Sequence, residues 1–210
     1  MADKNKQHEV GECRMKNFIT SYLHTMQETI GKVDPQDIVD IIQLLESCHE
    51  HSGKIYIIGN GGSAATSSHM ANDLSVGLKL RKIRNFDVES LADNAAVCTA
   101  IANDTGYENI FYTQLLHRLR EKDIVIAISC SGDSPNIVKA VKYANQIGSK
   151  VVGLTGFNGG YLKDNCNVGL HVATEHGAYG IVEDIHMMLD HVIFSYYLSL
   201  QQKSFLATAI

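Results

Sequence analysis

The sequence lacks several features that would assign it to a common class of protein. No hydrophobic run approaches the length of a membrane span, and the first ten residues, MADKNKQHEV, contain no apolar signal core. The five cysteines are odd in number, scattered and free of CxxC spacing, which indicates free thiols in a reducing compartment. We therefore expect a cytoplasmic protein that neither spans a membrane nor contains a disulfide framework or a zinc ribbon.

Basic charge and a triphosphate-binding motif are also missing. The net charge is −5 at pH 7, which argues against a nucleic-acid surface because phosphate backbones usually need a basic face. The pattern GxxxxGK[ST] is absent, which argues against a nucleotide triphosphatase. With 210 residues, of which 45% are hydrophobic, the chain is long enough for a well-buried core. We expect residues 1–210 to form one domain.

Predicted strands alternate with predicted helices along most of the chain. Strands are expected at residues 54–58, 86–91, 123–129, 150–155 and 167–173. Because buried, unbroken apolar strands that alternate with helices are typical of parallel sheets, we expect an α/β fold with a three-layer, doubly wound sheet. A polar turn is expected at residues 103–106, a helix at 107–119, and a long last helix at 179–202.

Two helices are predicted before the first strand. Residues 1–10 look frayed, and the apolar spacing within residues 14–52 indicates a pair of amphipathic helices separated by Asp34-Pro35. Such a pair exceeds what the sheet needs to cover its own core. We therefore expect the segment 14–52 to be a helical hairpin that packs in an oligomer.

Two turns after strands are suited to binding an anion. The first strand ends at Gly59-Asn60-Gly61-Gly62-Ser63, where glycines let several N–H groups point to one place beside a helix N-terminus. The strand at 123–129 leads into Cys130-Ser131-Gly132-Asp133-Ser134-Pro135, in which Ser134 suits the N-cap of the next helix. Since ligands of such sheets lie at the carboxyl ends of strands, we expect the two turns to converge.

A dinucleotide site is the alternative for the first turn. Gly59-x-Gly61-x-x-Ala64 satisfies the loose fingerprint, but the acidic residue that should follow about twenty positions later is missing, because Asp87 and Glu89 lie later and inside an expected strand. That scheme also gives no role to the hydroxyl groups of the second turn. A small phosphorylated ligand accounts for both turns.

Ionisable side chains gather on two of the expected helices. His69 and Asp73 are four residues apart and share one helix face, and the last helix contains Glu183, His186, Asp190 and His191. If the two helices meet, they supply two histidines and two carboxylates, a set that suits zinc or another divalent cation. The spacing alone does not show that they meet.

Four motifs carry a family resemblance. GNGGSAATSSHMANDL, NDTGY, AISCSGDSPNIVKA and VEDIHMMLDH occur in this order over nearly the whole chain and resemble the sugar isomerase (SIS) domain family, specifically its phosphoheptose isomerase branch, which acts on sedoheptulose 7-phosphate. The resemblance implies a five-stranded parallel sheet with helices on both faces. It also implies a homotetramer with sites between subunits, often containing zinc.

The resemblance also assigns functional positions. Those implied to bind the sugar phosphate are Asn60, Gly61, Gly62, Ser63, Asn103, Asp104, Ser129, Cys130, Ser131, Ser134 and Glu183. Those implied to bind the metal are His69, Asp73, Glu183 and His191. In an aldose–ketose isomerisation through an enediolate, Asp73 is expected to be the base and His191 the acid.

The chain departs from the family pattern at four positions. Asp73 replaces the longer glutamate, Glu183 replaces a glutamine, Cys130 replaces a threonine, and Gly180 replaces an acidic residue. Such changes would retune the metal or the substrate, or mark a member that has lost catalysis. The rival interpretation is a phosphosugar-binding regulator, similar to the tetrameric SIS protein that associates with the replication initiator. The ionisable cluster favours the enzyme, because a scaffold has no use for it.

Overall fold

The structure is a computed structural model that describes the backbone of residues 2–207 and the side chains of residues 11–201. It divides into two compact units, residues 1–33 and 34–210. Within these described ranges, no helix has the length and apolar content that a membrane span requires. The two leading helices fall in different units, so the hairpin expected at 14–52 stays a prediction. The single domain and the fraying of residues 1–10 also stay predictions.

The first unit is a single helix, α1 (Ala2–Ile30), which begins earlier than the sequence predicts. Its apolar residues recur at three- and four-residue spacing, as expected for an amphipathic helix. Met15, Phe18, Ile19 and Leu23, which we call the α1 stripe, are between 54% and 70% exposed. The α1 stripe is therefore a row of apolar side chains that helix α1 does not itself bury.

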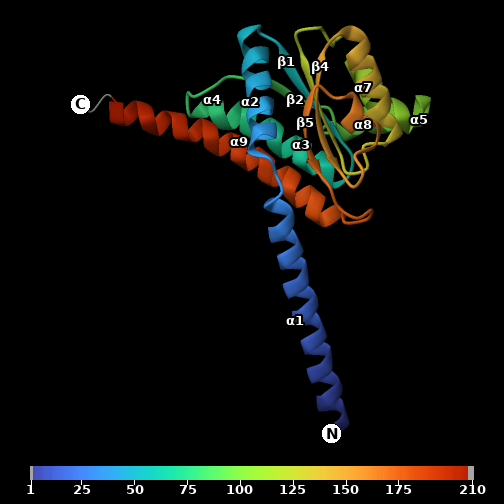
Figure 1. Cartoon of the computed structure of the whole chain (residues 1–210). Coiled ribbons are helices and arrows are strands. Elements are labelled where there is room, and N and C mark those ends of the chain that lie inside the picture. The colour runs from blue at the N-terminus through green and yellow to red at the C-terminus, as the bar shows by residue number, and fades with distance from the viewer. Residues whose placement is uncertain (1, 208–210) are drawn as a thin grey trace. The chain divides into compact units, whose positions relative to one another are not determined.

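The second unit contains a five-stranded parallel sheet (Figure 1). Its strands are β1 (Lys54–Gly59), β2 (Asp87–Ser90), β3 (Ile124–Ser129), β4 (Lys150–Gly156) and β5 (Val168–Val172). Their order is β2-β1-β3-β4-β5, and every neighbouring pair is parallel. The α/β fold predicted from the alternation of strands and helices is confirmed.

Helices cover both faces of this sheet. They are α2 (Pro35–Glu50), α3 (Gly62–Asn72), the π-helix η1 (Asp73–Gly77), α4 (Leu78–Leu80), α5 (Ala95–Thr105), the 3₁₀-helix η2 (Tyr107–Asn109), α6 (Ile110–Leu115), α7 (Pro135–Ile147), α8 (Gly160–Asn165) and α9 (Tyr179–Ala207). Figure 1 shows α2, α3 and α9 on one side of the sheet and α5, α7 and α8 on the other. The unit therefore has the three layers of a doubly wound fold.

Alternating side chains of the strands form two cores. Tyr56 and Ile58 pack in a buried cluster with residues of α6, α7 and α8, whereas Ile55 and Ile57 point to the opposite face. The strand register then sets the position of the functional loops. Gly59, the last residue of β1, pairs with Ile128 next to the end of β3, so the loops after these two strands are neighbours.

Local structure differs from expectation in two loops. The predicted polar turn at 103–106 is wrong, because α5 continues to Thr105 and ends only where Gly106 adopts a φ of 102°. The helix predicted for 107–119 is shorter, since it ends at Leu115 shortly before His117, whose φ is 60°. Neither η1 nor α8 was predicted, as a π-helix and a six-residue helix leave little periodic signal.

Candidate active site

The glycine turn places the N-terminus of α3 beside the end of β1. Gly61 is the N-cap of α3 and has a φ of 55°, a conformation that glycine adopts readily. At Gly62, an added Cβ would overlap the carboxyl group of Glu183 from α9. Gly62 therefore leaves the space that this carboxyl group occupies.

The serine loop supplies the opposite wall. Gly132 donates its backbone N–H to Ser129 Oγ at 3.1 Å, and Ser129 Oγ lies 3.5 Å from Ser134 Oγ. Ser134 is the N-cap of α7, as predicted, but its side chain makes no capping hydrogen bond. Its hydroxyl group is thus available to a ligand at the positive end of α7.

The two loops meet in one cavity of about 160 Å³. It is lined by Asn60, Ser63, Ile128, Ser129, Cys130, Ser131, Ser134, Tyr179 and Glu183. Seven of these nine residues are among the substrate positions implied by the sequence, and Gly61 and Gly62 belong to the turn itself. Burial and, second, the nearby Glu183 raise the pKa of Cys130 to about 11, so its thiol is neutral at pH 7 and adds no negative charge.

The polar pair Asn103 and Asp104 is not among the residues that line this cavity. Both residues are exposed in the last turn of α5, where Asn103 Nδ2 donates to Asp104 Oδ1 at 2.9 Å. The structure thus brings together the loop positions but leaves this pair outside the cavity. Its role at the sugar stays a prediction.

A buried asparagine, missed by the sequence analysis, holds the glycine turn to α7. Asn136 is only 1% exposed and exchanges two hydrogen bonds with Asn60, of 2.8 and 2.9 Å. Tyr107 donates its hydroxyl group to Asn60 Oδ1 at 2.9 Å. These contacts fix the amide of Asn60 at the cavity. The sequence feature that could have revealed Asn136 is its position directly after Pro135, at the start of a helix. A buried amide there needs a hydrogen-bond partner.

The helices α3 and α9 also bring a second set of ionisable groups together. One donor atom from each of His69, Asp73, Asp190 and His191 can be chosen so that all four lie within 4.8 Å of one another. His191 Nε2 is 3.1 Å from His69 Nε2, and His69 Nε2 is 3.6 Å from Asp73 Oδ2 and 3.7 Å from Asp190 Oδ2. We call these four residues the His/Asp cluster. Asp73 opens the π-helix η1, a type of element that is frequent at functional sites.

Asp190 is the buried member of the His/Asp cluster. Its side chain is 0% exposed, and neither of its carboxyl oxygens has a hydrogen-bond partner among the described residues. Burial and, second, the charge of Asp73 raise its pKa to about 7, while His191 opposes this shift. A buried carboxylate without hydrogen bonds is costly, so it calls for a cation or a proton.

The donor set fits a divalent metal ion. Zinc binds imidazole nitrogens and carboxylate oxygens at about 2.0–2.2 Å, which places tetrahedral donors about 3.4 Å apart. The three distances from His69 Nε2, of 3.1, 3.6 and 3.7 Å, are close to this spacing. Three of the four predicted ligands, His69, Asp73 and His191, therefore lie together, whereas Glu183 points into the loop cavity.

His186, one turn before Asp190 on α9, lies deeper in the protein. It is 0% exposed, and its Nε2 lies 3.2 Å from the backbone oxygen of Thr155, to which an N–H can donate. Its Nδ1 has no partner among the described residues. Burial lowers the pKa of His186 to about 4, so it is neutral at pH 7.

The chain is similar to proteins of known family. The sequence profile of the SIS domain matches residues 18–156. The chain belongs to the SIS domain family. The phosphoheptose isomerase of Syntrophotalea carbinolica is 35% identical to this SIS chain over 164 residues, 77% of this chain and 83% of the relative. That of Clostridium acetobutylicum is 34% identical over 184 residues, 85% of this chain and 92% of the relative. These relatives place the SIS chain in the phosphoheptose isomerase branch.

Solved structures agree with the sequence relatives. The phosphoheptose isomerase structure from Neisseria gonorrhoeae matches with a TM-score of 0.75 and 29% identity, over 89% of this chain and 97% of that one. The structure from Francisella tularensis matches with a TM-score of 0.77 and 28% identity, over 88% and 96%. The fold and the family implied by the four sequence motifs are both confirmed.

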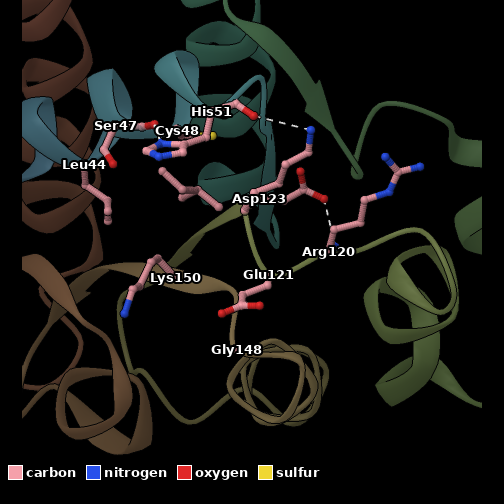
Figure 2. A pocket seen from close by; sticks show the side chains of 11 residues that line it. Leu44, Ser47, Cys48, His51, Arg120, Glu121, Asp123, Gly148 and Lys150 are labelled. Carbon is pink, nitrogen blue, oxygen red and sulfur yellow. Dashed lines mark hydrogen bonds between the residues drawn. The ribbon is translucent and has the colours of Figure 1, made fainter.

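A larger cavity of about 490 Å³ lies at the amino ends of β3 and β4 (Figure 2). Its buried acid, Asp123, accepts backbone N–H groups of Lys54 and Arg120, both at 2.9 Å. Lys122 donates to the backbone oxygen of His51 at 3.4 Å. The buried carboxylate is therefore satisfied by the chain itself, and this edge is opposite to the one where ligands of such sheets bind.

Proposed function

We propose that this SIS protein is a phosphoheptose isomerase that interconverts sedoheptulose 7-phosphate and a D-glycero-heptose 7-phosphate. The observation that carries the proposal is that α3 and α9 both contribute to the loop cavity and to the His/Asp cluster. Ser63 and His69 on α3, and Glu183 and His191 on α9, are about 9 and 12 Å apart along the helix axes at 1.5 Å per residue. The six C–C bonds of an extended seven-carbon chain, about 1.5 Å each, together with its phosphoester span roughly 10 Å, which is comparable to these separations. A sugar held by its phosphate in the cavity thus reaches the cluster with its carbonyl end.

The loop cavity binds the phosphate group. The N-termini of α3 and α7 supply free backbone N–H groups and partial positive charge. Ser129, Ser131 and Ser134 supply hydroxyl donors, and the neutral thiol of Cys130 adds no repulsion. Asn60 and Glu183 are left to bind hydroxyl groups of the sugar.

A neighbouring subunit completes the site. The cavity of about 160 Å³ is smaller than the roughly 300–1,000 Å³ of typical ligand pockets, which supports a second wall from another copy. The exposed α1 stripe supports an assembly of several copies, and we propose the homotetramer of the family. Asn103 and Asp104, outside the cavity of their own chain, then face a sugar at the subunit boundary.

All five cysteines are free thiols, which supports a reducing, cytoplasmic location.

A divalent cation, with zinc as the preferred ion, would be held by His69, Asp73, His191 and a second carboxylate. When bound, it polarises the carbonyl group of the substrate. Asp73, whose side chain is 14% exposed, is the base that removes the proton next to the carbonyl, and His191 is the acid. His191 Nε2 and His69 Nε2 lie 3.1 Å apart, within hydrogen-bond distance of each other.

Turnover of sedoheptulose 7-phosphate tests the proposal. The purified protein, supplied with zinc, should form an aldose heptose phosphate and exchange a C1 proton in D₂O, both detectable by NMR. Asp73→Asn should abolish turnover while sugar phosphate still raises the melting temperature. Asp184→Asn, an exposed change on the same helix as His191, should leave turnover unchanged. If the wild-type protein binds the sugar phosphate but never turns it over, the rival interpretation, a non-catalytic phosphosugar-binding regulator, is correct instead.

A further inference from the structure

We infer that Asp190 is a ligand of the divalent cation, in the position that the family pattern gives to Glu183. The inference deepens the proposed function by naming the ligand set, which is two imidazoles and two aspartates. It rests on the geometry of the His/Asp cluster and is testable without any isomerase assay.

The first argument is distance. Asp190 Oδ2 lies 3.7 Å from His69 Nε2, nearly the same as the 3.6 Å between His69 Nε2 and Asp73 Oδ2. The two aspartates therefore stand in equivalent positions relative to His69. Both separations are close to the spacing of donors that share one tetrahedral metal ion.

The second argument is burial without a hydrogen-bond partner. The carboxyl group of Asp190 is 0% exposed, and both of its oxygens lack hydrogen bonds within the described residues. It also faces a second carboxylate, Asp73, across a gap of less than 4.8 Å. Two carboxylates this close, one of them out of contact with water, need positive charge between them, and a divalent cation balances both.

The third argument is that Glu183 is occupied elsewhere. Its carboxyl group lies directly over Gly62, where an added Cβ would overlap it, and it lines the loop cavity next to Cys130. Glu183 is thus placed for the sugar rather than for the cation. The two aspartates then have different roles. Asp190 is inaccessible and holds the cation, whereas Asp73 retains access to the substrate.

Metal affinity in two matched variants tests the inference. Asp190→Asn and Glu183→Gln each replace a carboxylate by its isosteric amide on the same helix. The zinc content, the zinc affinity from competition with a chromophoric chelator, and the visible spectrum of the cobalt-substituted protein would be measured for both. Circular dichroism of the metal-free variants shows that each is folded, and Asp184→Asn is the surface control.

We expect the wild-type protein to bind one zinc ion per chain in the cluster. Asp190→Asn should weaken the affinity at least tenfold, as even the loss of an outer-shell partner costs 10–100-fold, and should alter the cobalt spectrum. Glu183→Gln should change the affinity less than threefold and leave the spectrum intact. Equal losses in both variants, a loss in Glu183→Gln alone, or a wild-type protein that binds no zinc would overturn the inference. Zinc bound through Asp190 without isomerase turnover would instead refute only the proposed function.

Discussion

Two buried side chains on α9 predict opposite pH dependences of stability in the metal-free protein. The pKa of Asp190 is raised from 3.8 to about 7 by burial and by Asp73, whereas burial lowers the pKa of His186 from 6.5 to about 4. Between pH 3.8 and about 7, Asp190 binds more protons in the folded state than in the unfolded state, so its contribution to stability falls as pH rises. His186 binds fewer protons when folded, so its contribution rises with pH up to its unfolded pKa of 6.5.

The magnitudes follow from the two shifts. At about 1.4 kcal/mol per pH unit, Asp190 costs at most about 4 kcal/mol above pH 7 and nothing below pH 4. His186 costs at most about 3 kcal/mol below pH 4 and nothing above pH 6.5. The two slopes largely cancel between pH 4 and 6.5 in the wild-type protein. Substitution of either residue should therefore expose the pH dependence of stability that the other residue causes.

Asp190→Asn should therefore be as stable as the wild-type protein at pH 4 and more stable by up to about 4 kcal/mol at pH 7.5, when both are free of metal. Urea unfolding in chelator, at several pH values and at one protein concentration, measures the difference, in which the unchanged titrating groups cancel. Added zinc should reverse the order, because only the wild-type protein keeps the full ligand set. A stability difference that is flat with pH, or a variant that is less stable at pH 7.5 without metal, would refute the reasoning.

Three other substitutions probe the loops and the α1 stripe. Gly62→Ala places a methyl group where the Glu183 carboxyl lies, so we expect little loss of stability but an increase in the KM for the sugar phosphate of about tenfold, the value of one charge-assisted hydrogen bond. Asn136→Ala removes the paired hydrogen bonds to Asn60 and should lower the free energy of unfolding by about 1–3 kcal/mol and raise KM. Phe18→Asp puts a charge into the α1 stripe and should yield smaller assemblies in light scattering.

Each of these three has a matched control and a contrary result. Combining Gly62→Ala with Glu183→Ala should add no further loss in KM, and fully additive losses would contradict the overlap. Gln146→Ala, on the exposed side of α7, should leave KM unchanged; an equal effect there would contradict the role given to Asn136. Lys16→Ala, beside the α1 stripe, should leave the assembly intact, and an unchanged assembly in Phe18→Asp would exclude the α1 stripe from the interface.

Local sequence patterns were sufficient for the sheet and for the two turns that follow β1 and β3. The β-branched runs that end at Gly59 and Ser129 are strands, and both are followed by helices with open N-termini, because strand length, glycine and N-cap chemistry are local properties. They were not sufficient at the end of α5, where Asn103 and Asp104 look like a turn. Exposed polar residues are tolerated in a last helical turn, and Gly106 provides the actual stop.

The sequence by itself determined the alternation of the five strands with the main helices along the chain, the four-residue spacing that brings His69 and Asp73 to one side of a helical segment, and the family through its four motifs. Tertiary structure decided which carboxylate of α9 meets that pair. Glu183 and Asp190 are seven residues apart, so both lie on nearly the same side of α9, and helical periodicity cannot choose between them. The choice depends on where α3 crosses α9, which places Gly62 under Glu183 and His69 beside Asp190.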